Sequence, residues 1–512
     1  MGKISRLRVL IRNYGMVKSC RIVRNKILSS SRFQKKKIVA IIRNSIKESK
    51  LKEERKTKFP YEPSFGILVP LYNTDSDMLK CVIESVIKQS YSNWELCLYN
   101  GSGNENTSVD EICREYCSRD VRIKYRVGNN LGISENTNEC AKMTNSEYLG
   151  LLDHDDILHP SALFEVTKTL NENKYDFIYT DEVTFSKKIT NVVSTNFKPD
   201  YSPESLRCNN YICHFLVMKR KLLEQAGGFR GEYDGAQDFD LVLRLTEAAN
   251  CIVHIPKILY HWRSHDASTA ANPMSKLYAY EAGRRAVESH LERCGEPGVV
   301  SDTRFYGFYQ TTYAIPEKYS VNLVFFSCEG ENHKKILNNF SSDFHRQKAG
   351  NVIYYDNGFN KFVIFSKEQE IEGEVLIFAE AGLGNVSVEA LQQLSVNCLR
   401  DGIGMAGGRI LSGKGELLYG RMEPDKEGRL VYADAGLPKG FTGYFHKAIL
   451  QQNTEAVSHR LFAVRTDLLK QWEPEISGTS EELMRQLCSY VKKSGYRIAY
   501  VPLATANRKR DG

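Results

Sequence analysis

The sequence predicts an α/β protein in which strands and helices alternate along the chain. Short apolar runs bounded by polar residues, such as Phe65–Val69 and Leu149–Leu152, indicate buried strands. Between such runs the apolar residues recur at helical spacing, as they do at Met78, Val82, Ile83, Val86 and Ile87. This alternation is typical of a mostly parallel sheet, which binds its ligands at the carboxyl edge of its strands.

The predicted elements follow one another from residue 65 to residue 293. Strands are expected at 65–69, 94–99, 122–125, 149–152, 177–179, 211–218 and 252–255. Helices are expected at 136–143, 161–171, 219–226, 237–248 and 275–293. The segment between residue 179 and Pro203 has no clear period and is expected to be irregular.

Length and composition limit the class of protein. A chain of 512 residues exceeds what one hydrophobic core usually serves, so two or three domains are expected. The hydrophobic content of 42% fits a folded soluble protein, and no apolar run approaches the ~20 residues of a membrane span. The N-terminus lacks the apolar core of a signal peptide. The 13 cysteines include no C-x-x-C pair, which favours reduced cytosolic thiols over a metal site.

Positive charge is concentrated at the N-terminus. Residues 1–58 hold 19 Lys or Arg and 3 Glu, a net charge of +16, so the rest of the chain carries 8 − 16 = −8. Apolar residues share a helical face at Leu7, Leu10, Ile11 and Tyr14, and again at Val39, Ile42 and Ile46. A basic amphipathic arm is typical of a peripheral element on an anionic membrane surface. A solvated arm and a nucleic-acid contact are the alternatives, and no nucleic acid is expected.

The C-terminal part of the chain looks like a degenerate copy of the part before it. At a constant offset of 246 residues, six identities recur, among them Leu222 as Leu468 and Pro256 as Pro502. The strand at 375–378 also aligns with the strand at 149–152, and on this alignment Asp153, Asp155 and Asp156 become Ala379, Ala381 and Gly382. At the offset of 246, Asp238 becomes Met484. We therefore expect an arm at 1–58, a catalytic domain at 59–310, and a second domain at 311–512 without catalytic carboxylates.

Three carboxylates in four residues follow the strand that ends at Leu152. They are Asp153, Asp155 and Asp156. Like charges gathered at a strand end cost energy unless a cation lies among them. A divalent ion such as Mg²⁺ or Mn²⁺ suits carboxylate oxygens. From this segment alone, a polar turn and helix start is the alternative.

Two further segments extend the pattern. Val69-Pro70-Leu71-Tyr72-Asn73 ends an earlier strand, and Gly235-Ala236-Gln237-Asp238-Phe239-Asp240 opens a later helix. In this order and spacing, the segments resemble family 2 glycosyltransferases of bacterial surface-polysaccharide synthesis, including rhamnosyltransferase-like members. Leu-Asp-His-Asp-Asp matches their DxD motif, and Gln-Asp matches their xED motif. The resemblance is close from about Phe65 to Arg293. It implies a GT-A fold, followed here by a second, smaller GT-A-like domain.

The resemblance also implies roles for individual residues. Asp238 would be the catalytic base, and Asp155, Asp156 and His265 would hold the metal. The nucleotide sugar would contact Pro70, Tyr72, Asn73, Asn100, Asn138, Asp153 and Arg263. Which of Asp153 and Asp156 binds metal and which binds ribose stays open. His261 is expected to be a buried, hydrogen-bonded histidine, which is also the alternative for His265. Two positions depart from the family: Asn100 replaces a usual aspartate, and Thr137 precedes Asn138 where many relatives have arginine.

These observations lead to one expected function and one alternative. We expect a metal-dependent, inverting glycosyltransferase that moves a sugar from a UDP- or dTDP-sugar to a lipid-linked glycan. It would work as a peripheral protein on the cytoplasmic face of the cell membrane. The alternative is a non-catalytic glycan-binding or scaffold protein built from two such folds. The four aspartates of the first half argue against this alternative there, and their loss argues for it in the second half.

Overall fold

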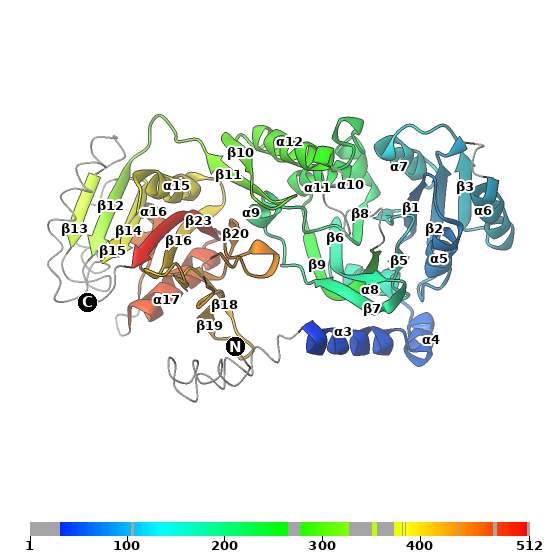
Figure 1. The fold of residues 1–512 in the computed structure, drawn as a ribbon, viewed down its shortest axis with the longest axis horizontal. Helices are drawn as coiled ribbons and strands as arrows, with labels where there is room; N and C mark the ends of the chain where they lie inside the picture. The colour runs from blue at the N-terminus through cyan, green and yellow to red at the C-terminus, as the bar shows by residue number, and fades with distance from the viewer. Residues whose placement is uncertain are drawn as a thin grey trace, which may run out of the picture. The chain divides into compact units, whose positions relative to one another are not determined.

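A computed structural model describes residues 31–103, 107–264, 277–326, 351–355, 373–380, 382–384, 386–438, 440–474 and 479–508 (Figure 1). The chain divides into two compact units. Unit 1 comprises Met1–Tyr201 and Ile212–Gly283, and unit 2 comprises Ser202–Tyr211 and Arg284–Gly512. The chain therefore passes between the units three times, whereas the sequence led us to expect a single boundary after residue 310.

A nine-stranded sheet forms the centre of unit 1. Its order is β3-β2-β1-β4-β8-β6-β9-β5, with β7 paired to β6. The strands are β1 (Phe65–Leu71), β2 (Trp94–Asn100), β3 (Ile123–Val127), β4 (Tyr148–Leu151), β5 (Ile157–Leu158), β6 (Phe177–Ser186), β7 (Lys188–Asn196), β8 (Leu216–Lys219) and β9 (Ile252–Arg263). The four strands from β3 to β4 run parallel, but β8 lies antiparallel between β4 and β6. The α/β class is confirmed, and the sheet is mixed rather than mostly parallel.

The first strand shows why this sheet forms the core. In β1, Phe65, Ile67, Leu68 and Val69 are all fully buried. Because neighbouring residues point to opposite faces, both faces of this strand must be covered, which is usual for parallel strands. The strands that carry the site are therefore held in a core that excludes water.

Helices connect the strands of unit 1. They are α3 (Ser31–Ser45), α4 (Glu48–Lys56), α5 (Ser76–Ile87), α6 (Thr107–Arg119), α7 (Ile133–Lys142), α8 (Ala162–Glu172), α10 (Arg220–Gln225), the short η2 (Gly231–Tyr233), α11 (Gln237–Ala248) and α12 (Leu277–Arg293), whose last residues belong to unit 2. The helix expected at 237–248 is found with those bounds. Asp75 begins α5, since its carboxylate accepts from the backbone N–H groups of Asp77 and Met78.

The segment expected to be irregular is a β-hairpin. β6 continues to Ser186, and β7 returns antiparallel beside it from Lys188. The prediction missed β7 because Val192 is its one fully buried residue, so the strand shows no alternation. The strand expected at 211–218 is also shorter, since β8 begins at Leu216.

The second half of the basic arm is part of unit 1. Ile38 and Ile42 of α3 are buried against Val183 and Val192 of the β6–β7 hairpin. The Ser45 hydroxyl lies 2.9 Å from the Nε2 atom of His159. Of the apolar face predicted at Val39, Ile42 and Ile46, Ile42 is therefore buried on protein, and Val39 is partly buried beside it. Residues 1–30, which carry the other predicted face, lie outside the described residues.

Unit 2 is built around a second large sheet. The strands of unit 2, in this sheet and in two smaller ones, are β10 (Gly298–Asp302), β11 (Tyr309–Tyr313), β12 (Val321–Phe326), β13 (Asn351–Tyr355), β14 (Val375–Glu380), β15 (Leu383–Gly384), β16 (Ile403–Leu411), β17 (Leu417–Tyr419), β18 (Arg421–Pro424), β19 (Leu430–Tyr432), β20 (Gln452–Asn453), β21 (Ala456–Val457), β22 (Leu461–Arg465) and β23 (Arg497–Arg508). Its helices are α9 (Pro203–Leu206), α15 (Val388–Leu399), η4 (Tyr444–His446), α16 (Thr466–Gln471) and α17 (Ser480–Lys493).

The two large sheets share one topology. The sheet of unit 2 has the order β13-β12-β14-β22-β16-β23-β15. In unit 1 the corresponding order is β2-β1-β4-β8-β6-β9-β5. Each neighbouring pair of strands in one sheet is parallel or antiparallel as the corresponding pair is in the other. The antiparallel partner of β6, which is β7, has its counterpart in β17 beside β16. This agreement supports the internal repeat inferred from six identities.

The strand register corrects one detail of that repeat. Tyr148 pairs with Lys219 in unit 1, and Val375 pairs with Arg465 in unit 2. Lys219 and Arg465 are 246 residues apart, the predicted offset, so Tyr148 corresponds to Val375. Five residues further along, Asp153 corresponds to Glu380 and not to Ala379. The expected comparison was displaced by one residue because strands without gaps or motifs do not define their register in the sequence.

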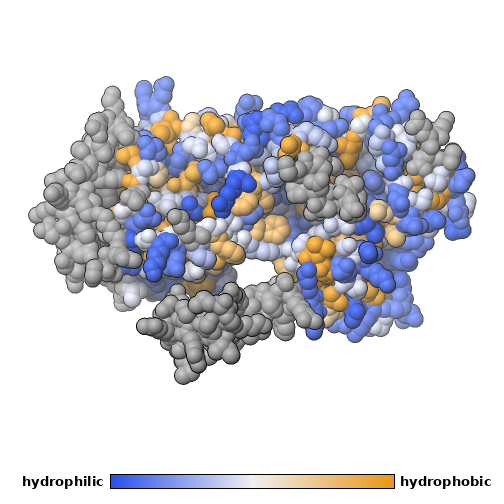
Figure 2. All heavy atoms as spheres, viewed as in Figure 1, coloured by the Kyte–Doolittle hydropathy of each residue, from blue (hydrophilic) through white to orange (hydrophobic). Residues whose placement is uncertain are grey.

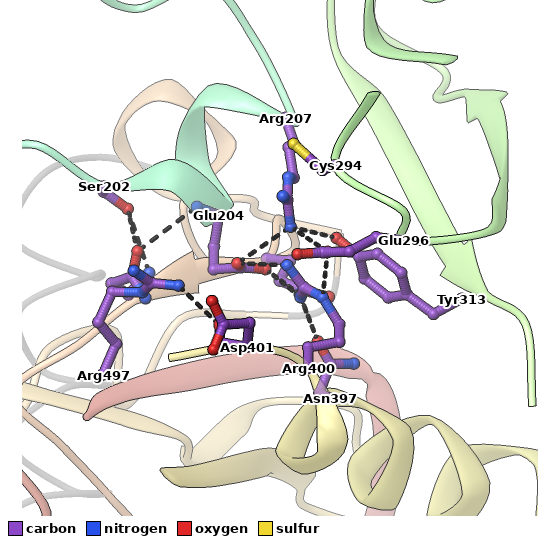
Figure 3. Close-up of polar contacts among 12 residues, drawn as sticks. Ser202, Glu204, Arg207, Cys294, Glu296, Tyr313, Asn397, Arg400, Asp401 and Arg497 are labelled. Atoms are coloured by element: carbon purple, nitrogen blue, oxygen red, sulfur yellow. Dashed lines mark hydrogen bonds and ion pairs between the residues drawn. The ribbon is translucent and has the colours of Figure 1, made fainter. Parts of the chain in front are cut away.

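A buried polar cluster joins the two chain segments of unit 2 (Figure 3). The side chain of Glu204 is fully buried and accepts from both terminal nitrogens of Arg400, each at 2.7 Å. Arg400 also donates to Glu296 at 2.6 Å, and Arg207 donates to the same carboxylate at 2.7 Å. The Tyr313 ring lies 3.9 Å from the guanidinium of Arg400. Two arginines and two glutamates thus balance each other's charge, which buried ions require.

Candidate active site

The carboxyl ends of three parallel strands place several predicted residues along one edge of the unit 1 sheet. Pro70 pairs with Tyr99, and Leu71 pairs with Asn100, so β1 and β2 end side by side. Asp153 follows β4, which is the other neighbour of β1. Because parallel strands present their carboxyl ends at the same edge, the predicted base pocket and carboxylates share that edge.

The Asn100 side chain braces a loop of the predicted base pocket. It is fully buried, and its Oδ1 atom accepts from the backbone N–H of Ser102 at 2.9 Å. Its Nδ2 atom donates to the Tyr125 hydroxyl at 3.1 Å. The Ser102 hydroxyl in turn accepts from the backbone N–H of Asn73 at 2.8 Å. The Tyr72 ring is half exposed beside this loop, as a flat surface for a nucleobase would need to be.

Asp156 is placed differently from the metal ligand expected there. Its carboxylate is fully buried, with one oxygen accepting from the Tyr260 hydroxyl and the other from the backbone N–H of Arg263, each at 2.6 Å. Burial raises the pKa of Asp156 well above its ordinary value, and Asp155 and Asp153 raise it further. Both oxygens therefore serve the packing of β9, and a metal site here would depend on Asp153 and Asp155.

Asp153 and Asp238 lie at two ends of one cluster. The Nε2 atom of His214 lies 3.4 Å from an Asp153 oxygen. His214, Cys213 and Asp238 each offer a ligand-type atom within 4.8 Å of the others, and the Cys213 thiol donates to Asp238 at 2.6 Å. The strand edge and the start of α11 thus meet at His214, although they are 85 residues apart in the sequence.

A buried ion pair holds the loop that carries His214. Lys198 and Glu182 lie 3.4 Å apart, and both side chains are buried. The Lys198 ammonium donates to the backbone carbonyls of Ile212 and His214, and Glu182 accepts from the His214 backbone N–H at 2.5 Å. Burial opposes ionisation of Glu182, but Lys198 and His214 outweigh it and hold its pKa at about 2. The loop therefore has a fixed shape set by the β6–β7 hairpin.

The His214 ring also packs against a neighbouring aromatic ring. It stacks on the Tyr260 ring with centroids 4.9 Å apart, and Tyr260 is the residue that donates to Asp156. Burial disfavours a charged His214, but Cys213, Asp153 and Glu182 together raise its pKa well above the ordinary value. Asp156 therefore contributes to the cluster indirectly, through Tyr260.

Asn138 and Arg263 make contacts within the protein. The side-chain amide of Asn138 makes two hydrogen bonds with the backbone of Phe229. Its Oδ1 atom accepts from the N–H at 2.9 Å, and its Nδ2 atom donates to the carbonyl at 3.0 Å. Asn138 thus joins α7 to the turn before α11. Arg263 donates from Nε to the backbone carbonyl of Asp155, and its guanidinium lies 4.8 Å from the Phe185 ring. One of its terminal nitrogens is buried without a partner in the described residues.

Asp153 and Asp155 form a donor set that fits a divalent metal. Asp153 has a side chain that is 48% exposed, and Asp155 is partly exposed in the same turn. Two carboxylates on an accessible turn suit Mg²⁺ or Mn²⁺ when nucleotide phosphates complete the coordination. His265, the third predicted ligand, lies outside the described residues. The thiol and imidazole of Cys213 and His214 are softer ligands and do not suit these ions.

The His261 ring lies in the core of unit 1, as expected, but without the hydrogen bonds expected of it. Both ring nitrogens lack a partner among the described residues. The ring stacks on His159 with centroids 5.9 Å apart. Burial lowers the pKa of His261 to about 4.

This burial predicts a pH dependence of stability. An ordinary histidine pKa is about 6.5. Because the folded pKa is depressed, His261 favours the folded state fully above the unfolded pKa. That contribution is lost as pH falls towards 4, by ~1.4 kcal/mol per pH unit. We expect His261→Phe to reduce the loss of unfolding free energy between pH 7 and pH 5, measured with urea. Equal losses in both proteins would contradict the buried neutral ring.

Comparison with known proteins identifies the class of this domain. The model for glycosyl transferase family 2 matches residues 66–227. O-antigen biosynthesis protein RfbC of Myxococcus xanthus is 34% identical over 251 residues, covering 49% of this chain and 20% of that protein. Uncharacterized protein y4gI of Sinorhizobium fredii is 28% identical over 483 residues, covering 86% of this chain and 52% of that protein. The chain thus spans about half or less of the length of these curated relatives.

Among solved structures, S. aureus TarS 1–349 in complex with UDP-GlcNAc is similar, with 18% identity and a TM-score of 0.37. The match covers 44% of this chain and 66% of that one. Taken with the family match, the topology of unit 1 places it in the GT-A class. Residues 66–227 thus match the glycosyl transferase family 2 model, which confirms the family resemblance, while the xED-like segment at 235–240 lies outside the match.

Four residues of the cluster were absent from the predictions. They are Glu182, Lys198, Cys213 and His214. One signal was available: Glu182 lies in a run of strand-forming residues, where a charged side chain is rare without a partner. Nothing in the sequence near Lys198 identified it as that partner, since the two residues meet only through the hairpin.

Proposed function

We propose that unit 1 transfers a sugar from a UDP- or dTDP-sugar to a glycan acceptor with inversion at the anomeric carbon. The observation that supports this most is the convergence of Asp153 and Asp238 on His214. A donor-side carboxylate at the strand edge and an acceptor-side carboxylate at a helix start are the two groups that such a displacement needs.

The proposed reaction assigns a role to each of these groups. Asp238 accepts the proton of the acceptor hydroxyl while that oxygen attacks the anomeric carbon of the donor. The bond from this carbon to the nucleotide diphosphate breaks in the same displacement, so the configuration inverts. The Cys213 thiol, which donates to one Asp238 oxygen, and the backbone N–H of Phe239, which donates to the other at 2.9 Å, orient the carboxylate. A divalent metal, when bound by Asp153 and Asp155, would neutralise charge on the leaving diphosphate.

A donor panel tests this proposal. UDP-, dTDP-, GDP- and ADP-sugars would be added to the full chain with Mn²⁺, and the melting temperature recorded. A ligand at 100 times its Kd stabilises the folded state by ~2.7 kcal/mol, which such a scan detects. We expect stabilisation by UDP- or dTDP-sugars. Stabilisation by none of these donors, with no transfer to any glycan acceptor, would contradict the proposal.

Asp155→Asn tests the metal site. The variant should keep its fold, because fewer like charges then lie in one turn. It should lose the part of the donor-induced melting shift that requires Mn²⁺, and with it transfer activity. Asp153→Asn should behave alike, whereas Asp156→Asn should lower the melting temperature without donor, since it leaves the Tyr260 and Arg263 contacts incomplete. Wild-type turnover unaffected by EDTA would rule out a metal-dependent reaction.

Unit 2 is proposed to be non-catalytic. Glu380, at the position of Asp153, forms an ion pair with Arg460, which is at the position of His214 by the offset of 246. An internal ion pair thus occupies the place where unit 1 has its half-exposed Asp153. Met484 corresponds to Asp238 and has no proton to exchange. This favours a scaffold or glycan-binding role for unit 2.

The acceptor and location also belong to this proposal. A lipid-linked glycan would bring the reaction to the inner face of the cell membrane, and the basic arm would keep the enzyme there. In the part of the chain that the structure describes, no helix is long and apolar enough to cross a membrane. We propose peripheral attachment through the charge on residues 1–58.

A further inference from the structure

A groove lies between α3 and β7 on unit 1, and none of the predicted site residues lines it. Its volume is about 690 Å³, and its walls come from one stripe of α3 and three residues of β7. The lining residues are Lys35, Lys36, Val39, Ala40, Arg43, Asn44, Thr190, Asn191 and Val192. Figure 2 shows hydrophilic side chains surrounding hydrophobic ones over this part of the surface.

The groove is cationic and contains no acid. Lys35, Lys36 and Arg43 line it, and none of them forms an ion pair with a described carboxylate. No aspartate or glutamate occurs in residues 31–47 of α3 and its end, or in residues 187–199 of β7 and its flanks. Three neighbouring cations without a counter-ion favour binding of an anion.

The uncharged residues of the groove lining indicate which class of anion would bind there. Asn44, Thr190 and Asn191 offer amide and hydroxyl groups, while Val39, Ala40 and Val192 give the groove an apolar part. A phosphate ester with an aliphatic portion matches both. The lining includes no aromatic ring on which a nucleobase could stack, which disfavours a single-stranded nucleic acid.

The groove has a fixed shape because α3 is anchored beside it. Ile38 and Ile42 are buried in the hairpin, and Ser45 lies against His159 at the end of the helix. The cationic stripe is thus turned away from the core. The basic residues of this helix are therefore held at the surface, while Ile38 and Ile42 pack on the hairpin.

We propose that the α3–β7 groove binds the phosphate headgroup of an anionic phospholipid and so docks unit 1 on the membrane. The proposal concerns attachment and does not depend on the sugar-transfer reaction. Phosphate oxygens lie among Lys35, Lys36 and Arg43, and the aliphatic part of the groove accommodates the glycerol carbons. Headgroup binding thereby fixes which face of unit 1 is turned to the lipid-linked substrate.

Vesicle binding by the full chain tests the proposal. Vesicles of phosphatidylcholine alone would be compared with vesicles of equal parts phosphatidylcholine and phosphatidylglycerol, in the absence of donor. The triple variant K35E/K36E/R43E reverses the three groove cations. The matched variant K168E/K174E/K221E makes the same change of net charge at exposed lysines elsewhere on unit 1. Because each surface cation contributes about fivefold, we expect the groove variant to bind at least ~100-fold more weakly, and the matched variant far less so.

A charge-neutral variant separates the groove from the basic arm as a whole. Ala40→Trp fills the groove without removing a cation, and it should reduce binding to phosphatidylglycerol vesicles. Inorganic phosphate as competitor distinguishes the sources of the anion: weak competition supports a lipid headgroup, whereas saturation by phosphate with no vesicle binding overturns docking. Transfer to a soluble acceptor should be unchanged in all variants, which shows that they fold.

Two results would overturn the proposal. One is an equal loss of vesicle binding in the groove variant and the matched variant, because general electrostatics would then explain attachment. The other is tighter binding of the wild type to a single-stranded RNA than to anionic vesicles, lost in the groove variant. Failure of the donor panel would leave these measurements unaffected, so the two proposals can fail separately.

Discussion

Replacing Asp238 with asparagine is expected to lower the rate of sugar transfer by about 10²- to 10⁴-fold, the usual contribution of a general base. The amide cannot accept the proton of the acceptor hydroxyl. The affinity for the donor should hardly change, because Asp238 lies at the start of α11 and not among the groups of the strand edge. Single-turnover rates and donor affinity, measured separately, check the two parts of this expectation.

Met484→Ala is the control from the other half of the chain. Met484 is buried, so its truncation should cost unit 2 about 2–5 kcal/mol of unfolding free energy. The single-turnover rate should stay unchanged, because this position takes no part in proton transfer. A fully active Asp238→Asn enzyme, or an equal loss of rate in both variants, would contradict the assignment of the chemistry to unit 1.

Arg400→Met is expected to destabilise unit 2 by about 3–5 kcal/mol, the usual cost of removing one partner of a buried ion pair. Arg400 donates two hydrogen bonds to Glu204 and one to Glu296, and both carboxylates are largely buried. Without the guanidinium, two acids stay buried with Arg207 as their principal cation. Urea unfolding followed by tryptophan fluorescence would measure the change, since Trp472 is buried in unit 2.

Arg429→Met is the matched control for this prediction. Arg429 also pairs with a carboxylate of unit 2, that of Asp425 at 2.8 Å, but its side chain is 68% exposed. Such a pair contributes little, because water screens it and already solvates both ions. We expect no measurable change in unfolding. If both variants unfolded at the same urea concentration as the wild type, the buried cluster would contribute nothing to stability.

The elements that the sequence predicted well are those with a strong local signal, either a run of buried apolar residues or a family motif. β1 is apolar on both faces, and α11 opens on a segment that matches a family motif, so each was placed within about two residues. β7 was missed because an edge strand with one buried residue carries no period. The register of β14 was misplaced by one residue for a related reason, since a short apolar run is compatible with several alignments.

For the candidate site, the sequence predicted which segments contribute to it better than it predicted the role of each residue. Neighbouring carboxylates look alike in a motif, but Asp156 is fully buried while Asp153 is half exposed. That difference arises from Tyr260 and Arg263, which lie more than 100 residues further along the chain. The His214 cluster likewise depends on contacts between distant segments. Side-chain burial of this kind is a property of the fold and cannot be derived from spacing alone.

The short segment Ser202–Tyr211 has a consequence for how this protein can be divided. It belongs to unit 2, yet unit 1 continues on both sides of it, and the Glu204 side chain is enclosed by residues near position 400. A gene truncated after residue 310 would encode a transferase that carries this acid without its arginine. A single recombination therefore cannot exchange either unit as a whole, because the three junctions between the units would require three coordinated crossovers.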